Sequence, residues 1–227
     1  MDWQITRTLA RRRHAARYDD IEARGYHAQP GLGTLRPEEE EAYLADIRRV
    51  WELRPGAAVL DAGAGTGALC RILSRQCGLS LTALEPSPAM LALLRSQREL
   101  ERVTAVAGFC DGAEDGRLFA EGSFDVVASR QLVNGLFDPL TAFRHWWRWL
   151  KPGGAAVVID GLYGRDAWRG PWEEEIDVLP LSACQSLATV PYLLESVGFR
   201  IAAAELMPAV NALPVTRTPR YIVVAVR

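Results

Sequence analysis

The sequence has few of the features that mark several common protein classes. The 227-residue chain has a formal net charge of −2, which gives no global attraction to nucleic acid or to an acidic membrane. It has no apolar run near the roughly 20 residues of a membrane span and no secretory signal at its start. The four cysteines form no C-x-x-C pair. We therefore expect a reduced cytoplasmic protein that binds neither nucleic acid nor membrane.

Two kinds of catalytic motif are also missing. The sequence has no histidine and cysteine spacing of the kind that binds zinc in hydrolases, so no metal site is predicted. It also lacks the G-x-S-x-G turn that presents a nucleophilic serine. Metal-dependent and serine hydrolysis are thus not indicated.

Short apolar runs alternate with helical patterns from Ala57 onward. The runs predict strands over residues 58–61, 81–85, 103–107, 124–129, 155–160, 200–206 and 221–226. Helices are predicted between them, over residues 68–76, 88–100, 139–150 and 190–197. Runs too apolar to alternate are typical of parallel strands buried on both faces. We predict an α/β fold with a doubly wound, mostly parallel seven-stranded sheet, whose last strand is antiparallel because no helix precedes it.

The first 50 residues have a different pattern. Residues 1–30 are helical and rich in arginine, and a second helix is predicted from Pro37 to about Leu53. The arginines are interpreted as a solvated helix face, with His14 exposed among them, in preference to a nucleic-acid surface. We predict a helical lid or substrate cap over residues 1–50 and a main domain over residues 51–227. Residues 161–188 are predicted to be an insertion on the substrate side.

A glycine loop follows the first predicted strand, in the stretch VLDAGAGTG. Its G-x-G-x-G spacing differs from the G-x-G-x-x-G of dinucleotide sites. Asp61 stands before the first glycine, where a carboxylate would repel a pyrophosphate but attract a cation. Glu85 ends the next strand, where a carboxylate can accept hydrogen bonds from both ribose hydroxyls. The pattern favours a cation that carries a ribose over NAD.

Three segments resemble the class I S-adenosylmethionine-dependent methyltransferases. They are VLDAGAGTG, LEPSPAML (residues 84–91) and the stretch from Gly122 to Gly154, and the resemblance extends over roughly residues 50–159. It is closest to the small-molecule branch, methyltransferase type 11, which includes quinone-ring and natural-product enzymes. The resemblance implies the Rossmann-like methyltransferase fold. It also implies S-adenosylmethionine as cofactor, with S-adenosylhomocysteine as product.

The resemblance also implies which residues contact the cofactor. The glycines would pass beneath its methionine part, Asp61 would lie near its amino group, and Glu85 would bind its ribose. The full set is Tyr18, Asp61, Gly63, Ala64, Gly65, Gly67, Glu85, Pro86, Ser87, Met90, Asp111, Gly112, Ala113, Ser129 and Arg130. One position departs from the family, which commonly has Gly-Asp-Ala where this chain has Asp111-Gly112-Ala113. Three alternatives follow: Asp111 is the acceptor for the adenine amine, only backbone atoms contact the adenine, or Asp111 is a loop acid that faces solvent.

The sequence gives less specific signals for the residues that would contact the methyl acceptor. The candidate catalytic residues are His27, Gln131, Asn134 and Asp160. His27 is either a base or an ordinary loop histidine, and Asp160 is the carboxylate expected nearest the acceptor. The candidate substrate-binding residues are the aromatics Tyr163, Trp168 and Trp172, which either wall an apolar ligand or pack a lid. The tryptophans of residues 146–149 either cover the sheet or form a contact in a homo-oligomer.

The predicted function is in-line transfer of a methyl group to a small-molecule partner, driven mainly by positioning. Oxygen or carbon of a phenolic, quinone-like or natural-product ring is favoured as acceptor, and nitrogen remains open. The alternative is a non-catalytic protein that binds S-adenosylmethionine as a partner subunit or sensor. An NAD-dependent oxidoreductase is disfavoured because the G-x-G-x-x-G spacing is missing.

Overall fold

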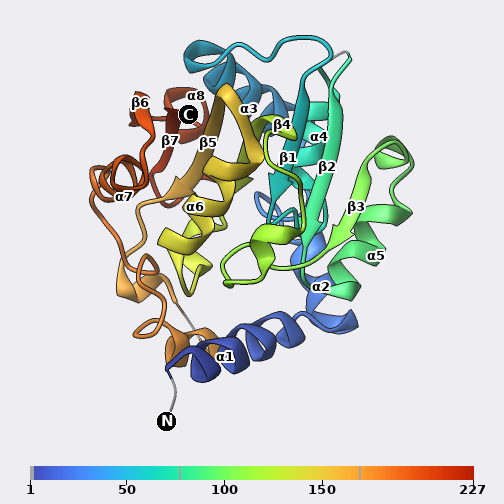
Figure 1. The fold of residues 1–227 in the computed structure, drawn as a ribbon. Coiled ribbons are helices and arrows are strands. Elements are labelled where there is room, and N and C mark those ends of the chain that lie inside the picture. The colour runs from blue at the N-terminus through green and yellow to red at the C-terminus, as the bar shows by residue number, and fades with distance from the viewer. Residues whose placement is uncertain (1–2, 77, 169) are drawn as a thin grey trace.

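A seven-stranded mixed sheet forms the centre of the molecule (Figure 1). The computed structural model describes residues 3–76, 78–168 and 170–227, and for residues 3–7, 171 and 172 it describes the backbone alone. The strand order is β3-β2-β1-β4-β5-β7-β6, and β7 is antiparallel to both of its neighbours. The strands are β1 (Ala58–Ala62), β2 (Ser80–Glu85), β3 (Thr104–Ala107), β4 (Phe124–Arg130), β5 (Leu150–Gly161), β6 (Arg200–Leu206) and β7 (Arg220–Val226). The predicted fold class and the antiparallel last strand are confirmed.

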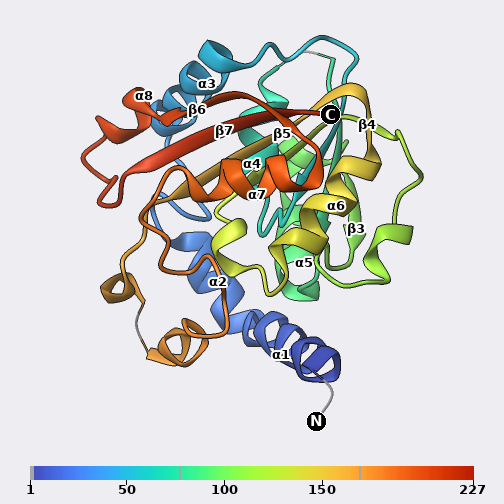
Figure 2. The same ribbon diagram turned by 60° about the vertical axis from the view of Figure 1, so that its left-hand side comes forward.

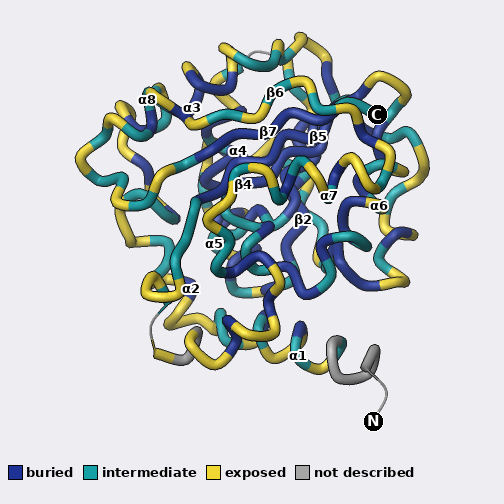
Figure 3. The backbone as a smooth tube through the Cα atoms, turned by 90° about the vertical axis from the view of Figure 1, so that its left-hand side faces the viewer, coloured by how far each residue is buried: buried dark blue, intermediate teal, exposed yellow. Residues whose placement is uncertain are grey.

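Helices cover both faces of the sheet. The α-helices are α1 (Trp3–Arg17), α2 (Asp20–Ala28), α3 (Pro37–Val50), α4 (Ala68–Ser74), α5 (Pro88–Ser96), α6 (Pro139–Trp149), α7 (Thr189–Val197) and α8 (Pro208–Asn211). Side chains of α6 and α7 pack on one face, and those of α3, α4 and α8 pack on the other. The central strands are buried between these layers, which explains their continuous apolar runs (Figure 3).

The order of the strands reverses between β1 and β4. Both strands are parallel and adjacent, but the chain continues outward from β1 through β2 and from β4 through β5. Ligands of doubly wound sheets bind at such a switch point, outside the carboxyl ends of the strands. The glycine loop after β1 and the segment after β4 lie there.

The helix predicted over residues 1–30 is two helices. Asp19 interrupts it, because its carboxylate accepts the backbone N–H groups of Ile21 and Glu22, each at 2.9 Å, and so caps α2. Both helices lie across the carboxyl edge of the sheet, and the segment of residues 161–188 lies beside α1 (Figures 1 and 2). Glu175 connects them, because its Oε2 lies 2.6 Å from His14 Nδ1 and its Oε1 forms an ion pair with Arg17 at 3.0 Å.

The helix α3 differs from α1 and α2. Its buried side chains Tyr43, Leu44 and Ile47 belong to the core on one face of the sheet, so α3 is not part of a cover over the carboxyl edge. Its buried Asp46 also accepts the backbone N–H groups of Ala209 and Val210 at the start of α8, the single turn between β6 and β7.

The tryptophans of α6 cover the sheet. Trp146 and Trp149 are fully buried, and Trp147 lies under the Arg227 guanidinium at 4.0 Å. In the described part of the chain, no helix combines the length and the apolar character that crossing a bilayer requires.

Candidate active site

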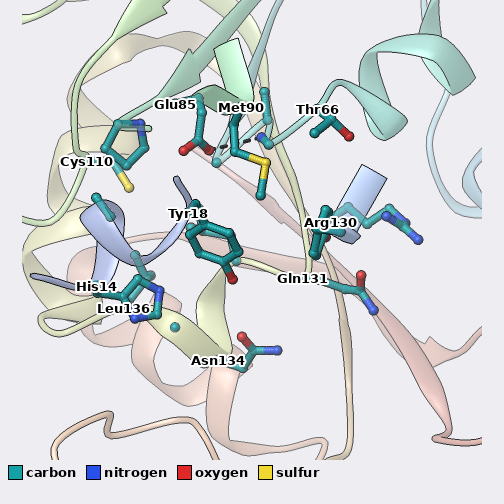
Figure 4. A pocket seen from close by; sticks show the side chains of 18 of the residues that line it. His14, Tyr18, Thr66, Glu85, Met90, Cys110, Arg130, Gln131, Asn134 and Leu136 are labelled. Atoms are coloured by element: carbon teal, nitrogen blue, oxygen red, sulfur yellow. Dashed lines mark hydrogen bonds between the residues drawn. The ribbon is translucent and has the colours of Figure 1, made fainter. Parts of the chain in front are cut away.

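A cavity of about 680 Å³ opens at the switch point of the sheet. The glycine loop, the ends of β2, β3 and β4, and the helices α1 and α2 all contribute to its wall. Fourteen of the predicted site residues line it: Tyr18, Asp61, Gly63, Ala64, Gly65, Glu85, Pro86, Met90, Asp111, Arg130, Gln131, Asn134, Tyr163 and Trp168. Residues far apart in the sequence thus meet in one site (Figure 4).

The glycine loop approaches the cavity through its first two glycines. Gly63 and Gly65 have φ of +67° and +55°, which favour glycine. A Cβ on Gly63 would lie 2.6 Å from Leu132, whereas the nearest atom to a Cβ on Gly65 is Tyr26 Cε1, at 4.0 Å across the cavity. Gly67 lies outside the lining, because its Cα faces Leu94 and Leu100 behind the loop. Its place there is a packing position between α4 and α5.

Glu85 is buried at the end of β2. Its Oε2 accepts the Gly65 N–H at 3.0 Å and its Oε1 accepts the Ser87 N–H at 2.8 Å. Burial raises the pKa of this carboxyl to about 6, although the two backbone hydrogen bonds lower it. Each oxygen keeps a lone pair that can accept a hydroxyl from a ligand.

Asp61 is the most strongly perturbed acid that lines the cavity. Burial raises its pKa to about 7, against the lowering effects of the Cys70 hydrogen bonds and of the Arg130 charge. Its Oδ2 accepts the Cys70 thiol at 3.2 Å, while its buried Oδ1 has no hydrogen-bond partner among the described residues. A buried acceptor of this kind is costly unless a donor reaches it from the cavity.

Tyr18 lies at the centre of the cavity, between Glu85 and Asn134 (Figure 4). Its carbonyl oxygen accepts the Ser87 hydroxyl at 2.9 Å, which joins the link between α1 and α2 to the start of α5. Ser87 also caps α5 by accepting the Met90 N–H at 3.2 Å. Ser87 therefore lies behind the lining, while Pro86 and Met90 are part of it.

Asp111 lines the cavity, but its carboxylate is held by the protein. Its Oδ1 forms an ion pair with Arg11 at 3.1 Å, and its Oδ2 accepts the backbone N–H of Phe137 at 2.9 Å. The Arg11 guanidinium lies against Gly112, where a Cβ would be 2.2 Å from it, and Ala113 is exposed. Asp111 is therefore a buried partner of α1 and not a loop acid in solvent, while its contact with adenine stays a prediction.

Asp160 is buried and lies outside the cavity lining. Its Oδ1 accepts hydrogen bonds from the Asn134 side-chain amide at 2.9 Å and from the Gly161 N–H at 2.8 Å. Its Oδ2 accepts hydrogen bonds from the backbone N–H groups of Val133 at 3.0 Å and Asn134 at 3.4 Å. Burial raises its pKa to about 6 in spite of these donors. The expectation that Asp160 contacts the acceptor is not met, because its oxygens hold the 3₁₀ turn η3 (Val133–Gly135). Asp160 thus positions Asn134.

The end of β4 supplies three predicted residues. Ser129 is fully buried behind the lining. Arg130 donates to the carbonyls of Gly31 and Leu32 at 2.5 and 3.0 Å, which ties the loop after α2 to the sheet. Gln131 is the one described non-glycine residue with a positive φ, +55°. Such a conformation is strained and is frequent at functional sites.

The three histidines occupy different surroundings. His27 lies outside the cavity lining, with its Nδ1 3.0 Å from the Thr66 hydroxyl, and burial lowers its pKa. His14 lines the cavity with a side chain 21% exposed, so the expectation of a solvent-exposed His14 is wrong. His145 packs away from the site, with its Nδ1 3.0 Å from the Cys110 carbonyl.

Aromatic residues of the 161–188 segment form part of the cavity wall. Tyr163 and Trp168 both line it, with ring centroids 6.4 Å apart. Trp168 is anchored by its indole N–H, which donates to the Ser182 carbonyl at 2.8 Å. Trp172 belongs to the 3₁₀ segment η5 (Gly170–Glu175), and its side chain lies outside the described residues.

Sequence reasoning missed several lining residues, among them Arg11, His14, Tyr26, Phe109 and Arg220. The interpretation of the basic helix as solvated is wrong for Arg11, because this side chain is buried between Asp111 and Asp115, at 3.1 Å from each. The position of Arg220 could have been predicted from the sequence. An antiparallel last strand begins at the edge where the parallel strands end, which places its first residue at the site.

The donor set suits an organic ligand better than a metal. Within residues 3–76, 78–168 and 170–227, no three His, Cys, Asp or Glu side chains group as a metal site. Asp61 Oδ1 is a buried acceptor for an ammonium donor, Gly65 leaves open space beside it, and Glu85 can accept ribose hydroxyls. These features fit the methionine and ribose parts of S-adenosylmethionine.

Comparison with known proteins also indicates a methyltransferase. Residues 60–158 match the family described as Methyltransferase domain. The chain is 35% identical over 104 residues to a ubiquinone biosynthesis O-methyltransferase of Xanthomonas campestris, with 46% of this chain and 43% of the relative covered. It is 34% identical over 108 residues to a 2-methyl-6-phytyl-1,4-hydroquinone methyltransferase of Synechocystis, with 48% and 33% covered. It is 27% identical over 135 residues to phosphoethanolamine N-methyltransferase 2 of Caenorhabditis elegans, with 60% and 30% covered. The matched part therefore spans less than half of each relative.

Solved structures extend the similarity of the fold to most of the chain. A methyltransferase from Aquifex aeolicus superposes with a TM-score of 0.63 at 19% identity, covering 92% of this chain and 98% of that one. Phosphoethanolamine N-methyltransferase 2 of Haemonchus contortus, in complex with phosphomonomethylethanolamine and S-adenosylhomocysteine, has a TM-score of 0.68 at 19% identity, covering 93% and 58%. The [4+2]-cyclase SpnF superposes with a TM-score of 0.62 at 18% identity, covering 83% and 81%. The fold by itself therefore does not define the reaction.

The fold, the glycine loop with its two acids and the family match together define the class. Residues 60–158 match the methyltransferase domain, and the chain has the Rossmann-like fold of class I S-adenosylmethionine-dependent methyltransferases. Its sequence relatives include methyltransferases of quinone-type molecules, and the similar structure from Haemonchus contortus is a complex with S-adenosylhomocysteine.

Proposed function

We propose that this protein transfers the methyl group of S-adenosylmethionine to a small-molecule acceptor in the cavity beside Tyr18 and Gln131. The observation that carries the proposal is Asp61, whose buried Oδ1 has no partner in the described structure and lines the same cavity as Gly65 and Glu85. An aromatic or quinone-like acceptor methylated on oxygen or carbon is favoured, because two relatives have such names. Nitrogen stays open, because other relatives are N-methyltransferases.

The chain's own residues would bind and orient the reactants. When bound, the cofactor supplies a methyl group on a sulfonium, which an acceptor displaces in line while the electron pair of the broken bond stays on sulfur. Asp61 would accept the cofactor's ammonium group, Glu85 its ribose hydroxyls, and the Gly63–Gly65 backbone would run beneath it. The helices α1 and α2 would exclude water from above. Positioning of this kind can supply roughly 7–11 kcal/mol of a barrier.

We assign proton acceptance to His14 in place of His27. His14 lines the cavity, and its Nδ1 lies 2.6 Å from Glu175 Oε2, an arrangement that holds one ring tautomer and orients the ring. A Cβ on Gly135, next to Asn134, would lie 4.0 Å from His14 Nε2. With Nδ1–H donating to Glu175, Nε2 is the basic nitrogen. A base adds about 10²–10⁴-fold where the acceptor must lose a proton.

Two measurements test the proposal. In a thermal-shift comparison, S-adenosylmethionine and S-adenosylhomocysteine should raise the melting temperature and NAD should not. A coupled assay of S-adenosylhomocysteine release should then detect turnover with catechols, hydroquinones or small amines. Stabilisation by NAD alone would exclude the proposal, and cofactor binding without turnover on any acceptor would favour a binding protein or sensor.

The histidine assignment has its own test. The variant His14→Gln should lower kcat on a phenolic acceptor by about 10²-fold or more. The matched variant His27→Gln should keep the wild-type kcat. Equal loss in the two variants would contradict the assignment.

A further inference from the structure

Three arginine side chains reach the cavity, and they differ in their partners. Arg11 is paired with Asp111 and Asp115. Arg130 donates to two backbone carbonyls and lies over the Tyr43 ring at 4.9 Å. Arg220 has neither a carboxylate nor a backbone carbonyl as partner in the described part of the structure.

Among the described residues, the hydrogen-bond partners of the Arg220 guanidinium are two neutral side chains. It donates to the Tyr163 hydroxyl, and the Gln131 amide oxygen, turned toward it, accepts from it at 2.8 Å. No carboxylate oxygen of the described residues lies within 4.0 Å of it. Asp160 precedes Gly161, the strand partner of Arg220, and its oxygens accept hydrogen bonds from other donors.

Several elements hold this guanidinium in place. Arg220 is the first residue of β7 and lies opposite Gly161 in the register with β5. A Cβ on Gly161 would lie 2.5 Å from the Arg220 guanidinium, so the glycine leaves the room that this side chain occupies. Asn211 fixes the Arg220 backbone from both sides, accepting its N–H at 2.7 Å and donating to its carbonyl at 2.9 Å.

Gln131, which has a strained backbone, contacts the same Arg220 guanidinium. Its φ of +55° is unusual for a residue with a side chain, and its N–H donates to the Ile159 carbonyl at 2.8 Å. In this conformation the amide meets both Tyr163 and Arg220. Strain of this kind persists where the surrounding structure requires it. A fixed guanidinium, two neutral polar side chains and the aromatic wall of Trp168 therefore form one subsite.

We infer that this subsite binds an oxyanion carried by the methyl acceptor, either a carboxylate or a phosphate, with Arg220 as the residue that selects for it. The inference rests on the proposed function, since it names the acceptor class of that same cavity. The planar guanidinium has donors in a fork that matches both oxyanions. A positive charge with only neutral partners in a cavity gains most from an anionic ligand.

The carboxylate of the cofactor's own methionine part is the competing occupant. One observation favours the acceptor. Arg220 contacts the predicted acceptor-side residues Gln131 and Tyr163, and it has no hydrogen bond to a glycine-loop residue among the described residues.

The test measures binding to protein loaded with S-adenosylhomocysteine. Benzoate and phenyl phosphate are the two anionic probes, benzamide is the neutral one, and calorimetry gives the affinities. Wild-type protein should bind one anion at least about tenfold more tightly than benzamide, and the anion that wins identifies the oxyanion. Arg220→Gln should lose about 10- to 100-fold for that anion, and Arg220→Lys should fall in between because it keeps the charge without the fork.

Controls separate this inference from the proposed function. Arg217→Gln alters an exposed arginine nearby in the chain and should change nothing. Affinity for S-adenosylhomocysteine should stay within about twofold in every variant. Equal binding of benzamide and the anions, unchanged anion binding in a folded Arg220→Gln, or loss of S-adenosylhomocysteine affinity in place of anion affinity would each overturn the inference. If wild-type protein fails to bind S-adenosylhomocysteine, the proposed function fails, and the same probes titrated into cofactor-free protein still decide the role of Arg220.

Discussion

Glu85 Oε2 accepts the backbone N–H of Gly65 at 3.0 Å, so the acid at the end of β2 holds the glycine loop at the end of β1. The same carboxylate accepts the Ser87 N–H through its other oxygen. One side chain thus orients two segments of the cavity wall and still has lone pairs for a ligand. Its role in the site is to position the loop as well as to bind.

Substitution of Glu85 tests both roles. Glu85→Ala should weaken S-adenosylhomocysteine binding by about 10- to 100-fold, because hydrogen bonds to a charged acceptor are worth roughly 1.5–3 kcal/mol. Glu85→Gln keeps one acceptor and should lose less. Calorimetry checks both, with Glu99→Ala, at an exposed acid of the 3₁₀ turn η1 (Arg98–Leu100), as the control. Unchanged affinity in Glu85→Ala would remove the ribose assignment.

Asp61 predicts an unusual dependence of stability on pH. Its pKa in the folded chain, about 7, lies above the ordinary aspartate value of 3.8 because the carboxyl is buried. The folded state therefore binds the extra proton between these values, and the stability gained from it is full below about pH 4 and is lost as the pH rises through about 7. Asp61→Asn removes this loss, so cofactor-free Asp61→Asn should melt higher than wild type at pH 8.

Two measurements check the Asp61 prediction. The melting temperature of Asp61→Asn at pH 8 should exceed that of wild type by roughly 2–4 °C for each kcal/mol gained, and the difference should shrink at pH 5. Its affinity for S-adenosylhomocysteine should fall, because a neutral amide pairs poorly with an ammonium group. A lower melting temperature at pH 8, or full affinity, would contradict the role given to the buried carboxylate.

Gly65 and Gly67 should respond differently to alanine. Both have positive φ, but a Cβ on Gly67 would lie 2.6 Å from Leu100, whereas one on Gly65 would project into open space. Gly67→Ala should lower the free energy of unfolding more, by about 2–4 kcal/mol, from backbone strain and overpacking together. Gly65→Ala should cost about 1–2 kcal/mol and mainly weaken S-adenosylhomocysteine binding. Denaturant unfolding measures the stability of each variant, and calorimetry measures its affinity for S-adenosylhomocysteine. A larger loss of stability in Gly65→Ala, or a larger loss of affinity in Gly67→Ala, would contradict the roles given to the two glycines.

Arg11 should anchor α1 over the cavity. Arg11→Met leaves Asp111 and Asp115 without their shared cation, which for buried pairs costs about 3–5 kcal/mol. We expect α1 to detach and trypsin to cleave within residues 8–36 faster than in wild type, with S-adenosylhomocysteine protecting less well. The double variant Arg11→Met/Asp115→Asn should recover part of the loss. Wild-type cleavage rates in Arg11→Met would show that α1 is held by other contacts.

Much of the fold and the centre of the site could be predicted from local patterns. Apolar runs marked the strands. Asp61 and Glu85 lie near the ends of β1 and β2, Gly63 and Gly65 follow β1, and parallel pairing brings these strand ends to one edge. The partners of charged side chains could not be predicted in this way. Arg11 meets Asp111 across 100 residues of sequence, and nothing in either local pattern specifies that contact.

The sequence by itself determined the sheet, the position of the switch point and the glycine loop with its two acids, because strand burial and the loop that follows a strand depend on short stretches of chain. Only the tertiary structure decided which polar side chains remain available to a ligand. Burial and long-range pairing commit Asp111 and Asp160 to the protein, bring His14 into the cavity, and leave the Arg220 guanidinium with neutral partners. A carboxylate or guanidinium becomes a binding group when packing removes its other partners, and that is a property of the folded chain.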